Sequence, residues 1–285
     1  MIAQQSLKNW LESTNARYSA EQMPYQHRPL RALLDYSRDF GCKFAHDAPI
    51  AQSILNWFYE RSAPGSHAIG SIFTGAFYFD AYFWPLNIPI GYGSFKINPF
   101  DCLESMPNVI KENVAKSPED SDGLLKYWVD CCDYAYGLDE IQKLNLLTPG
   151  ALSFIENGNL ELSGAIDQLV TTKPNPKAIL SLRFACEIFM KALLIEKKGL
   201  DNAQLKKLSH SIKDIAKECY TVSGVSEFKI VADSAIIFPD VSDRYDGSSR
   251  NLCDVWSAVV ITQVAATTVI RCFSKRDMRS QTPSL

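Results

Sequence analysis

Three charged residues recur at every fourth position of one long apolar segment: Arg183, Glu187 and Lys191. This spacing places them along one face of a helix, where Glu187 can pair with either neighbour. Because a buried unpaired charge is costly, this charged stripe faces either solvent, with ordinary ion pairs, or a polar groove. In a groove the two cations could hold a phosphate, to which arginine makes bidentate contacts.

Other polar residues that suit an anion follow downstream. They are His210 near a predicted helix start, Arg244-Tyr245 in a polar loop, and Arg250-Asn251 at the start of the last long apolar segment. One phosphate could be held by four cations, namely Arg183, Lys191, Arg244 and Arg250. Alternatively, Arg244 anchors its loop by pairing with Glu187. We interpret His210 either as a ligand contact or as a packing and hydrogen-bonding residue.

Helices are the elements that must position these residues. The segment 177–198 is apolar nearly all round and ends before Gly199, which predicts a helix at the centre of a bundle. Further helices are predicted over 160–171, 203–218, 223–238 and 251–273, with a polar loop over 240–251. The cluster Thr148-Pro149-Gly150 predicts a boundary between a domain over 1–147 and a second over 151–285.

The first of these domains is predicted to be mostly helical and rich in aromatic residues. Helices are expected over 29–40, 48–61, 109–115 and 123–136. The period of 69–84 is ambiguous, and a helix is favoured because Phe73, Phe77 and Trp84 share a helical stripe. Its aromatic rings suit either base stacking or packing, in the core or against a partner. Packing is favoured because no lysine or arginine is interleaved with them.

Composition narrows the classes of function. The net charge is −3 and the pI is about 5.9, which argues against a general electrostatic binder of nucleic acid. One local exception is the basic tail from Arg271 to Arg279, which is either a groove wall or a solvated terminus. Residues 255–270 include threonine, serine and glutamine, so a buried helix is expected there rather than a membrane span.

The eight cysteines suggest a reducing compartment. None has Cys-x-x-Cys spacing, and the pair Cys42 and His46 has no second pair beside it, so no metal site is expected. No cofactor is expected either, because phosphate-binding glycine loops are absent from the sequence. The polar first ten residues do not resemble a signal peptide. These features together predict a cytoplasmic protein.

Three sets of residues, in order, resemble the HEPN superfamily (higher eukaryotes and prokaryotes nucleotide-binding). Ala185, Glu187 and Lys191 match its Ala-x-Glu-x-x-x-Lys helix, which continues here as Ala-Leu-Leu. His210-x-Ile212 is similar to its second helix motif. Arg244-Tyr245 is similar to the Arg-Tyr that precedes its last long helix. The resemblance covers residues 158–273 and implies an all-α protein whose C-terminal part is an up-and-down HEPN bundle.

Many members of that family are metal-independent ribonucleases with an Arg-x(4–6)-His motif. Arg250 resembles the start of this motif, but Val255, Trp256 and Ser257 stand where the histidine is expected. The resemblance therefore implies a non-catalytic module that binds a nucleotide, RNA or a protein partner, in a prokaryotic defence or toxin–antitoxin setting. One alternative is a divergent endoribonuclease in which His210 acts with Arg244 or Arg250.

The other alternative is a purely structural dimerisation protein. A homodimer is expected in either case, with the last helix contributing its apolar face, and no membrane contact is expected. The residues proposed for that face are Trp256, Val259, Val260, Ala265 and Val269.

Overall fold

The computed structural model describes residues 4–42, 48–62, 70–91, 97–201, 204, 210–239 and 250–281. Helices dominate these residues, and a two-stranded sheet accompanies them. The chain forms two compact units. The N-terminal unit comprises Met1–Thr74 and Asn87–Ile97, and the C-terminal unit comprises Gly75–Leu86 and Asn98–Leu285. Residues 148–150, where the sequence predicts a boundary, are the N-cap and the first two residues of a helix within the C-terminal unit.

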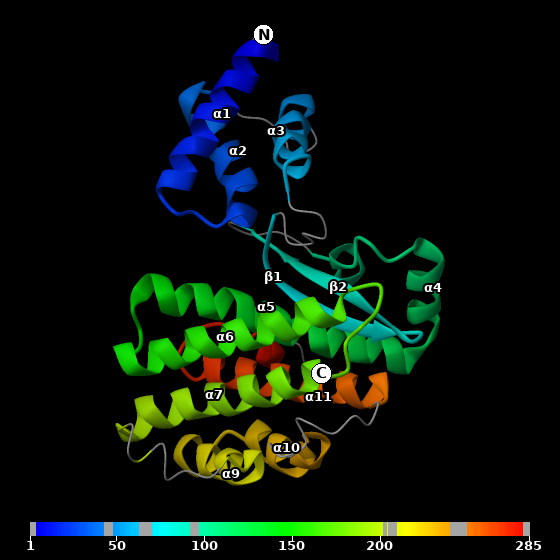
Figure 1. The fold of residues 1–285 in the computed structure, drawn as a ribbon, viewed down its shortest axis with the longest axis vertical. Coiled ribbons are helices and arrows are strands. Elements are labelled where there is room, and N and C mark those ends of the chain that lie inside the picture. The colour runs from blue at the N-terminus through cyan, green and yellow to red at the C-terminus, as the bar shows by residue number, and fades with distance from the viewer. Residues whose placement is uncertain are drawn as a thin grey trace. The chain divides into compact units, whose positions relative to one another are not determined.

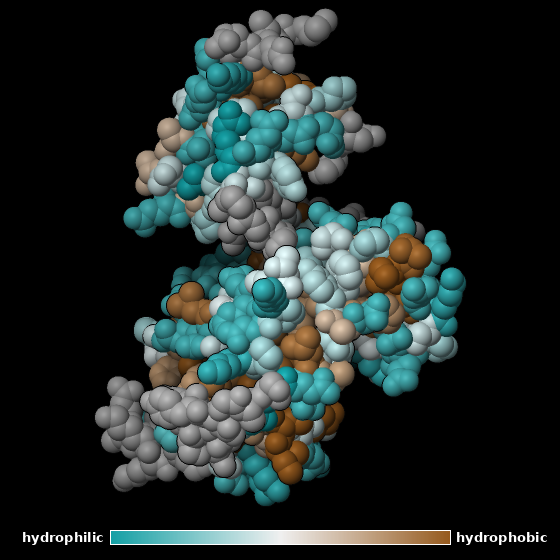
Figure 2. All heavy atoms as spheres, turned by 45° about the vertical axis from the view of Figure 1, so that its right-hand side comes forward, coloured by the Kyte–Doolittle hydropathy of each residue, from teal (hydrophilic) through white to brown (hydrophobic). Residues whose placement is uncertain are grey.

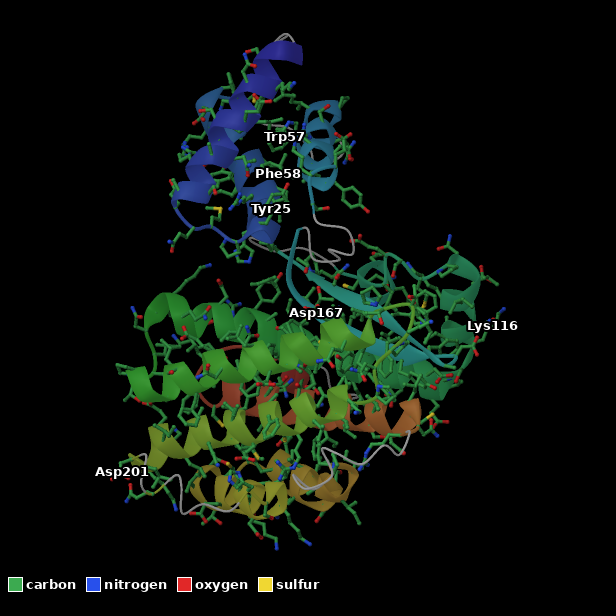
Figure 3. The ribbon with its side chains drawn as sticks, in the orientation of Figure 1. Tyr25, Trp57, Phe58, Lys116, Asp167 and Asp201 are labelled. Atoms are coloured by element: carbon green, nitrogen blue, oxygen red, sulfur yellow. The ribbon has the colours of Figure 1, made fainter. Side chains whose placement is uncertain are left out.

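Three helices build the N-terminal unit: α1 (Gln4–Ala20), α2 (Arg28–Asp39) and α3 (Pro49–Tyr59). A single turn, η1 (Tyr25–His27), leads into α2. Both α2 and α3 have proline in the first turn, where its missing N–H costs no helical hydrogen bond. In Figure 3, Tyr25, Trp57 and Phe58 lie together among these helices, and the Tyr25 hydroxyl donates to the Phe58 carbonyl at 2.9 Å.

The predicted helix over 69–84 is wrong, because this segment forms a hairpin of β1 (Ser71–Phe79) and β2 (Tyr82–Pro89). Asp80 and Ala81 between the strands both have positive φ, 52° and 61°. Two such residues make the kind of tight turn whose twist matches antiparallel strands. The expected core packing of its aromatic rings is confirmed for three buried side chains, Phe73, Phe77 and Phe83.

The C-terminal unit is built around four long helices: α5 (Pro118–Leu144), α6 (Pro149–Leu169), α7 (Ala178–Lys198) and α11 (Leu252–Arg271). Shorter elements complete it: η2 (Pro99–Cys102), α4 (Asn108–Lys116), α9 (Ile212–Ser223), α10 (Glu227–Asp233), η3 (Ser234–Ile237) and η5 (Arg279–Gln281). The structure is therefore mostly helical, as the sequence predicts.

Helix α7 occupies the middle of this unit (Figure 1). It packs against α6, α9 and α11, and α11 in turn packs against α5 and α10. Most of its apolar residues are buried, among them Leu182, Phe189 and Leu193, while Phe184 and Ile188 are half-buried. Polar residues on the buried side of α7 therefore face another helix.

Candidate functional site

The charged stripe on α7 is buried. Arg183, Glu187 and Lys191 are 6%, 5% and 8% exposed, respectively. The interpretation of the stripe as an exposed face is therefore wrong, because α6, α9 and α11 cover the helix that carries it. Three charges have been moved away from water in the middle of a bundle, and each requires a compensating partner.

Glu187 is the centre of the resulting network. Its Oε1 accepts from Lys191 Nζ at 2.7 Å, and its Oε2 lies 3.6 Å from Arg183 Nη1. The second separation is too long for a hydrogen bond. Arg183 Nη1 and Glu187 Oε2 are both inaccessible to solvent, and neither has a hydrogen-bond partner among the residues that the structure describes. One carboxylate thus faces two cations, which leaves an excess of positive charge among these three residues.

His210 connects this buried network with the surface. Its Nδ1 lies 2.9 Å from Glu187 Oε1, and its backbone carbonyl accepts from Arg183 Nη2 at 2.6 Å. The imidazole side chain is nevertheless 72% exposed. The next residue, Ser211, caps α9 by accepting from the backbone N–H of Asp214, which fixes the chain beside the histidine.

The geometry of His210 suits two kinds of chemistry. A carboxylate bonded to one ring nitrogen sets the orientation of an imidazole and leaves the other nitrogen for a ligand or a proton transfer. The excess positive charge behind the ring favours an anionic ligand such as a phosphate. The hydrogen-bonding interpretation of His210 is therefore confirmed, and its role as a ligand contact, which the exposed ring permits, stays a prediction.

Of the other predicted ligand residues, two lie at the start of α11 and two lie outside the described residues. Asn251 is the N-cap of α11, and its side-chain oxygen accepts from Cys253 N at 3.0 Å. Arg250 precedes it and is half-buried. Arg244 and Tyr245 lie outside the described residues, so the suggested pairing of Arg244 with Glu187 stays a prediction. The structure brings together the charged stripe and His210.

A second charged cluster was not predicted. Asp130 and Asp133 on α5 are 3% and 1% exposed. Arg271 Nη2 donates to both, at 2.8 Å and 2.6 Å, and Arg279 Nη2 donates to Asp130 at 2.8 Å. The backbone N–H of Met278 also donates to Asp133, at 2.8 Å.

This cluster corrects both interpretations of the basic tail from Arg271 to Arg279. Its arginines are neither frayed nor arranged along a groove, because buried acids of α5 hold two of them and Glu140 pairs with Arg276 at 2.8 Å. Two aspartates three residues apart inside an apolar helix were the signal that could have revealed this cluster. Buried carboxylates on one helical face require a cationic partner.

The cysteines are free thiols, and most are buried. Burial raises the pKa of Cys131 and Cys186 far above the ordinary value, which keeps these thiols protonated and unreactive. Within the described ranges no three His, Cys, Asp or Glu side chains are grouped as metal ligands. His46, the suggested companion of Cys42, lies outside those ranges.

Helix α11 is long and apolar enough to cross a membrane, the one such helix among the residues described, and 67% of its most apolar window is buried inside the unit. Thr262, Gln263 and Thr267 are fully buried within it. The expected dimer face on this helix is wrong for three of its residues, because the chain itself covers Val259, Ala265 and Val269. Those side chains pack in the core of the unit.

Comparison with known proteins adds no relative. No protein-family model matches the chain, and neither a curated protein nor a solved structure matches it.

Proposed function

We propose that the C-terminal unit is a non-catalytic HEPN-like module that binds a nucleotide or RNA at His210. The observation that supports this most is the buried Arg183–Glu187–Lys191 network, which has surplus positive charge and reaches the surface at an exposed imidazole. A network that served stability alone would gain little from being charged, because apolar residues of similar volume stabilise a core at least as well.

The order of elements is consistent with an up-and-down HEPN bundle. The helix with the Ala-x-Glu-x-x-x-Lys pattern is α7, the second motif stands at the start of α9, and the last long helix is α11. Three of the residues that match the first two motifs, Glu187, Lys191 and His210, contact one another. A sequence resemblance that falls on one connected set of side chains is more specific than the motifs taken singly.

An endoribonuclease is the second candidate, and one contact favours it. Glu187 holds His210 at 2.9 Å, which is how a carboxylate orients a histidine that acts as a general base. A base at this position could take the proton of a ribose 2′-hydroxyl. A phosphate-stabilising cation would then have to come from Arg244 or Arg250, as the sequence alternative requires.

An assay of RNA binding and cleavage on the purified full chain separates these functions. Wild type would be compared with His210→Ala and Arg244→Ala, and with Lys213→Ala as a control that removes an exposed charge from the first turn of α9. Binding without cleavage, weakened by His210→Ala and unchanged by the control, is the expected result. Cleavage that both site variants abolish would establish the ribonuclease instead. Neither binding nor cleavage would indicate a protein-interaction module.

Our proposal includes a cytoplasmic homodimer, in a prokaryotic defence or toxin–antitoxin setting. With much of α11 buried, the exposed apolar side chains of Ile230 and Ile236 are the better candidates for the contact, at 51% and 90% exposure. Hydrophobic residues form separate patches on the largely hydrophilic face in Figure 2. Light scattering would show a dimer for wild type and a monomer for Ile236→Asp. A strictly monomeric wild type would exclude the dimer.

A further inference from the structure

One buried carboxylate in the N-terminal unit gathers three arginines. Asp35 on α2 is 2% exposed. Its Oδ2 accepts from Arg17 Nη2 at 2.5 Å and from the Tyr18 hydroxyl at 2.8 Å. Its Oδ1 lies 3.2 Å from Arg31 Nε and 3.2 Å from Arg38 Nη2. Two helices, α1 and α2, therefore direct three guanidinium groups toward one point.

These arginines exceed what the aspartate needs. A single arginine balances the charge of Asp35, whereas three are present, with side chains 44%, 51% and 59% exposed for Arg17, Arg31 and Arg38. Asp39 pairs with Arg38 at 3.2 Å. Glu21 also attracts Arg17, so three carboxylates balance the three arginines, whose guanidinium groups still stand at the surface. Arg31 contacts Asp35 through its Nε. Among the described residues no other partner is shown for its two terminal nitrogens, which are therefore available to a ligand.

An aromatic surface adjoins the arginines through Asp39. Its Oδ2 accepts from Trp10 Nε1 at 3.2 Å, while its Oδ1 faces Arg38. The ring of Trp10 lies 6.0 Å from that of Phe40, centroid to centroid, and 5.1 Å from that of Tyr36. Phe40 is 42% exposed, an uncommon exposure for a phenylalanine that has aromatic neighbours to pack against.

We propose that this face of α1 and α2 binds single-stranded nucleic acid. Guanidinium groups fixed by a buried carboxylate are preorganised for bidentate contact with phosphate. An exposed ring beside them supplies the stacking surface that unpaired bases use. The chemistry recognised is a phosphate attached to an unstacked base, which an RNA or DNA strand or a free nucleotide can supply. This site is separate from the one proposed at His210 and does not depend on it.

The test is fluorescence anisotropy of a labelled single-stranded oligonucleotide with the full chain. The double variant Arg31→Gln/Arg38→Gln leaves Arg17 and Tyr18 in contact with Asp35, so the carboxylate keeps partners. We expect binding to weaken about tenfold or more, as loss of hydrogen bonds to charged groups implies. The slope of log K against log salt concentration should become shallower by about 1.4, because the variant removes two arginines and each phosphate contact with a single strand contributes about 0.7 to the slope.

The matched control is Lys8→Gln/Arg61→Gln, which removes two exposed positive charges from the same unit. Its binding should stay within about twofold of wild type, because a lost surface ion pair has little effect. Phe40→Ala, which leaves the arginines intact, should weaken binding of a single strand more than binding of a duplex. Circular dichroism of each variant establishes that the helices persist.

Several results would overturn the proposal. Equal weakening in the arginine variant and its control would mean non-specific attraction. Loss of binding in His210→Ala with none in the arginine variant would place nucleic acid on the C-terminal unit alone. A wild type that binds no oligonucleotide and no ATP would also refute it. Competition by ATP at the affinity of the oligonucleotide would support the site with a free nucleotide as its ligand.

Discussion

Replacing Glu187 by glutamine removes the one negative charge of the buried stripe and leaves its shape almost unchanged. Lys191 and Arg183, both more than nine-tenths buried, would then face each other across a neutral amide. At 2.7 Å and 3.6 Å, and with an effective dielectric constant of about 20, the two attractions amount to about 6 and 5 kcal/mol before desolvation. Desolvation offsets part of this, so removing one partner costs about 3–5 kcal/mol in total.

Thermal unfolding followed by circular dichroism measures this loss. In a domain of 150–250 residues each kcal/mol lowers Tm by about 2–4 °C, which predicts a fall of about 6–20 °C for Glu187→Gln. Replacing the whole stripe, Arg183→Met/Glu187→Leu/Lys191→Met, should restore Tm to the wild-type value or raise it, because no charge is left unpaired. A Tm for Glu187→Gln within about 2 °C of wild type would refute the burial argument. The triple variant should also lose RNA binding.

Three further predictions concern the contact of α5 with α11 and the tail. Asp133→Asn should lower the free energy of unfolding by about 3–5 kcal/mol, because the largely buried Arg271 loses a charged partner. Urea titrations measure this loss, and a change under about 1 kcal/mol would contradict the prediction. Burial, opposed by the nearby arginines, raises the pKa of Asp130 above 3.8. The free energy of unfolding of wild type should therefore fall relative to that of Asp130→Asn as the pH rises from 3.8. If the difference between the two free energies stays constant from pH 4 to 7, the prediction is wrong. A Cβ at Gly137 would lie 2.4 Å from Ile270 Cγ2 on α11. Gly137→Ala should therefore lower the free energy of unfolding by about 1–3 kcal/mol, although alanine favours helices more than glycine does. An unchanged urea midpoint would show instead that α5 and α11 can move apart.

The helices with strong end signals could be predicted well from the sequence. The predicted helix 177–198 differs from α7 by one residue, since Gly199 adopts φ 63° and ends it. Helix α6 begins about ten residues before its predicted start, at Pro149. The cluster at 148–150 is its N-cap and first turn: Thr148 Oγ1 lies 3.4 Å from the N–H of Ala151, and proline suits the position after the cap.

The other differences have local physical causes. Helix α5 starts at Pro118, before the predicted start at residue 123, because Ser117 caps it, and it continues past the predicted end at residue 136 to Leu144. The predicted helix 203–218 is confirmed from Ile212, where α9 begins, and at Gln204; residues 203 and 205–209 lie outside the described residues. The hairpin escaped prediction because Asp80-Ala81 lacks the glycine that marks most such turns, and its aromatic spacing also fits a helix.

The residues of the candidate site could be predicted from the sequence, but their burial could not. The spacing of the charged stripe and the position of His210 pointed to a connected set of residues. Whether that set faced water depended on α9 and α11, which lie far along the chain and cover α7 only after folding. The three arginines around Asp35 were missed for the same reason, since Arg17 comes from another helix than its partners.

The acids of α5 have a consequence for the order in which this chain can fold. Their cationic partners lie 138 to 149 residues further along the sequence. During synthesis, which proceeds from the N-terminus, α5 carries two aspartates that have no partner until α11 and the tail have been made. Such long sequence separations raise the contact order and slow folding. In a nascent chain that ends before residue 271, α5 should therefore not yet be packed in its final position. Chaperones would meet the chain in that partly folded state.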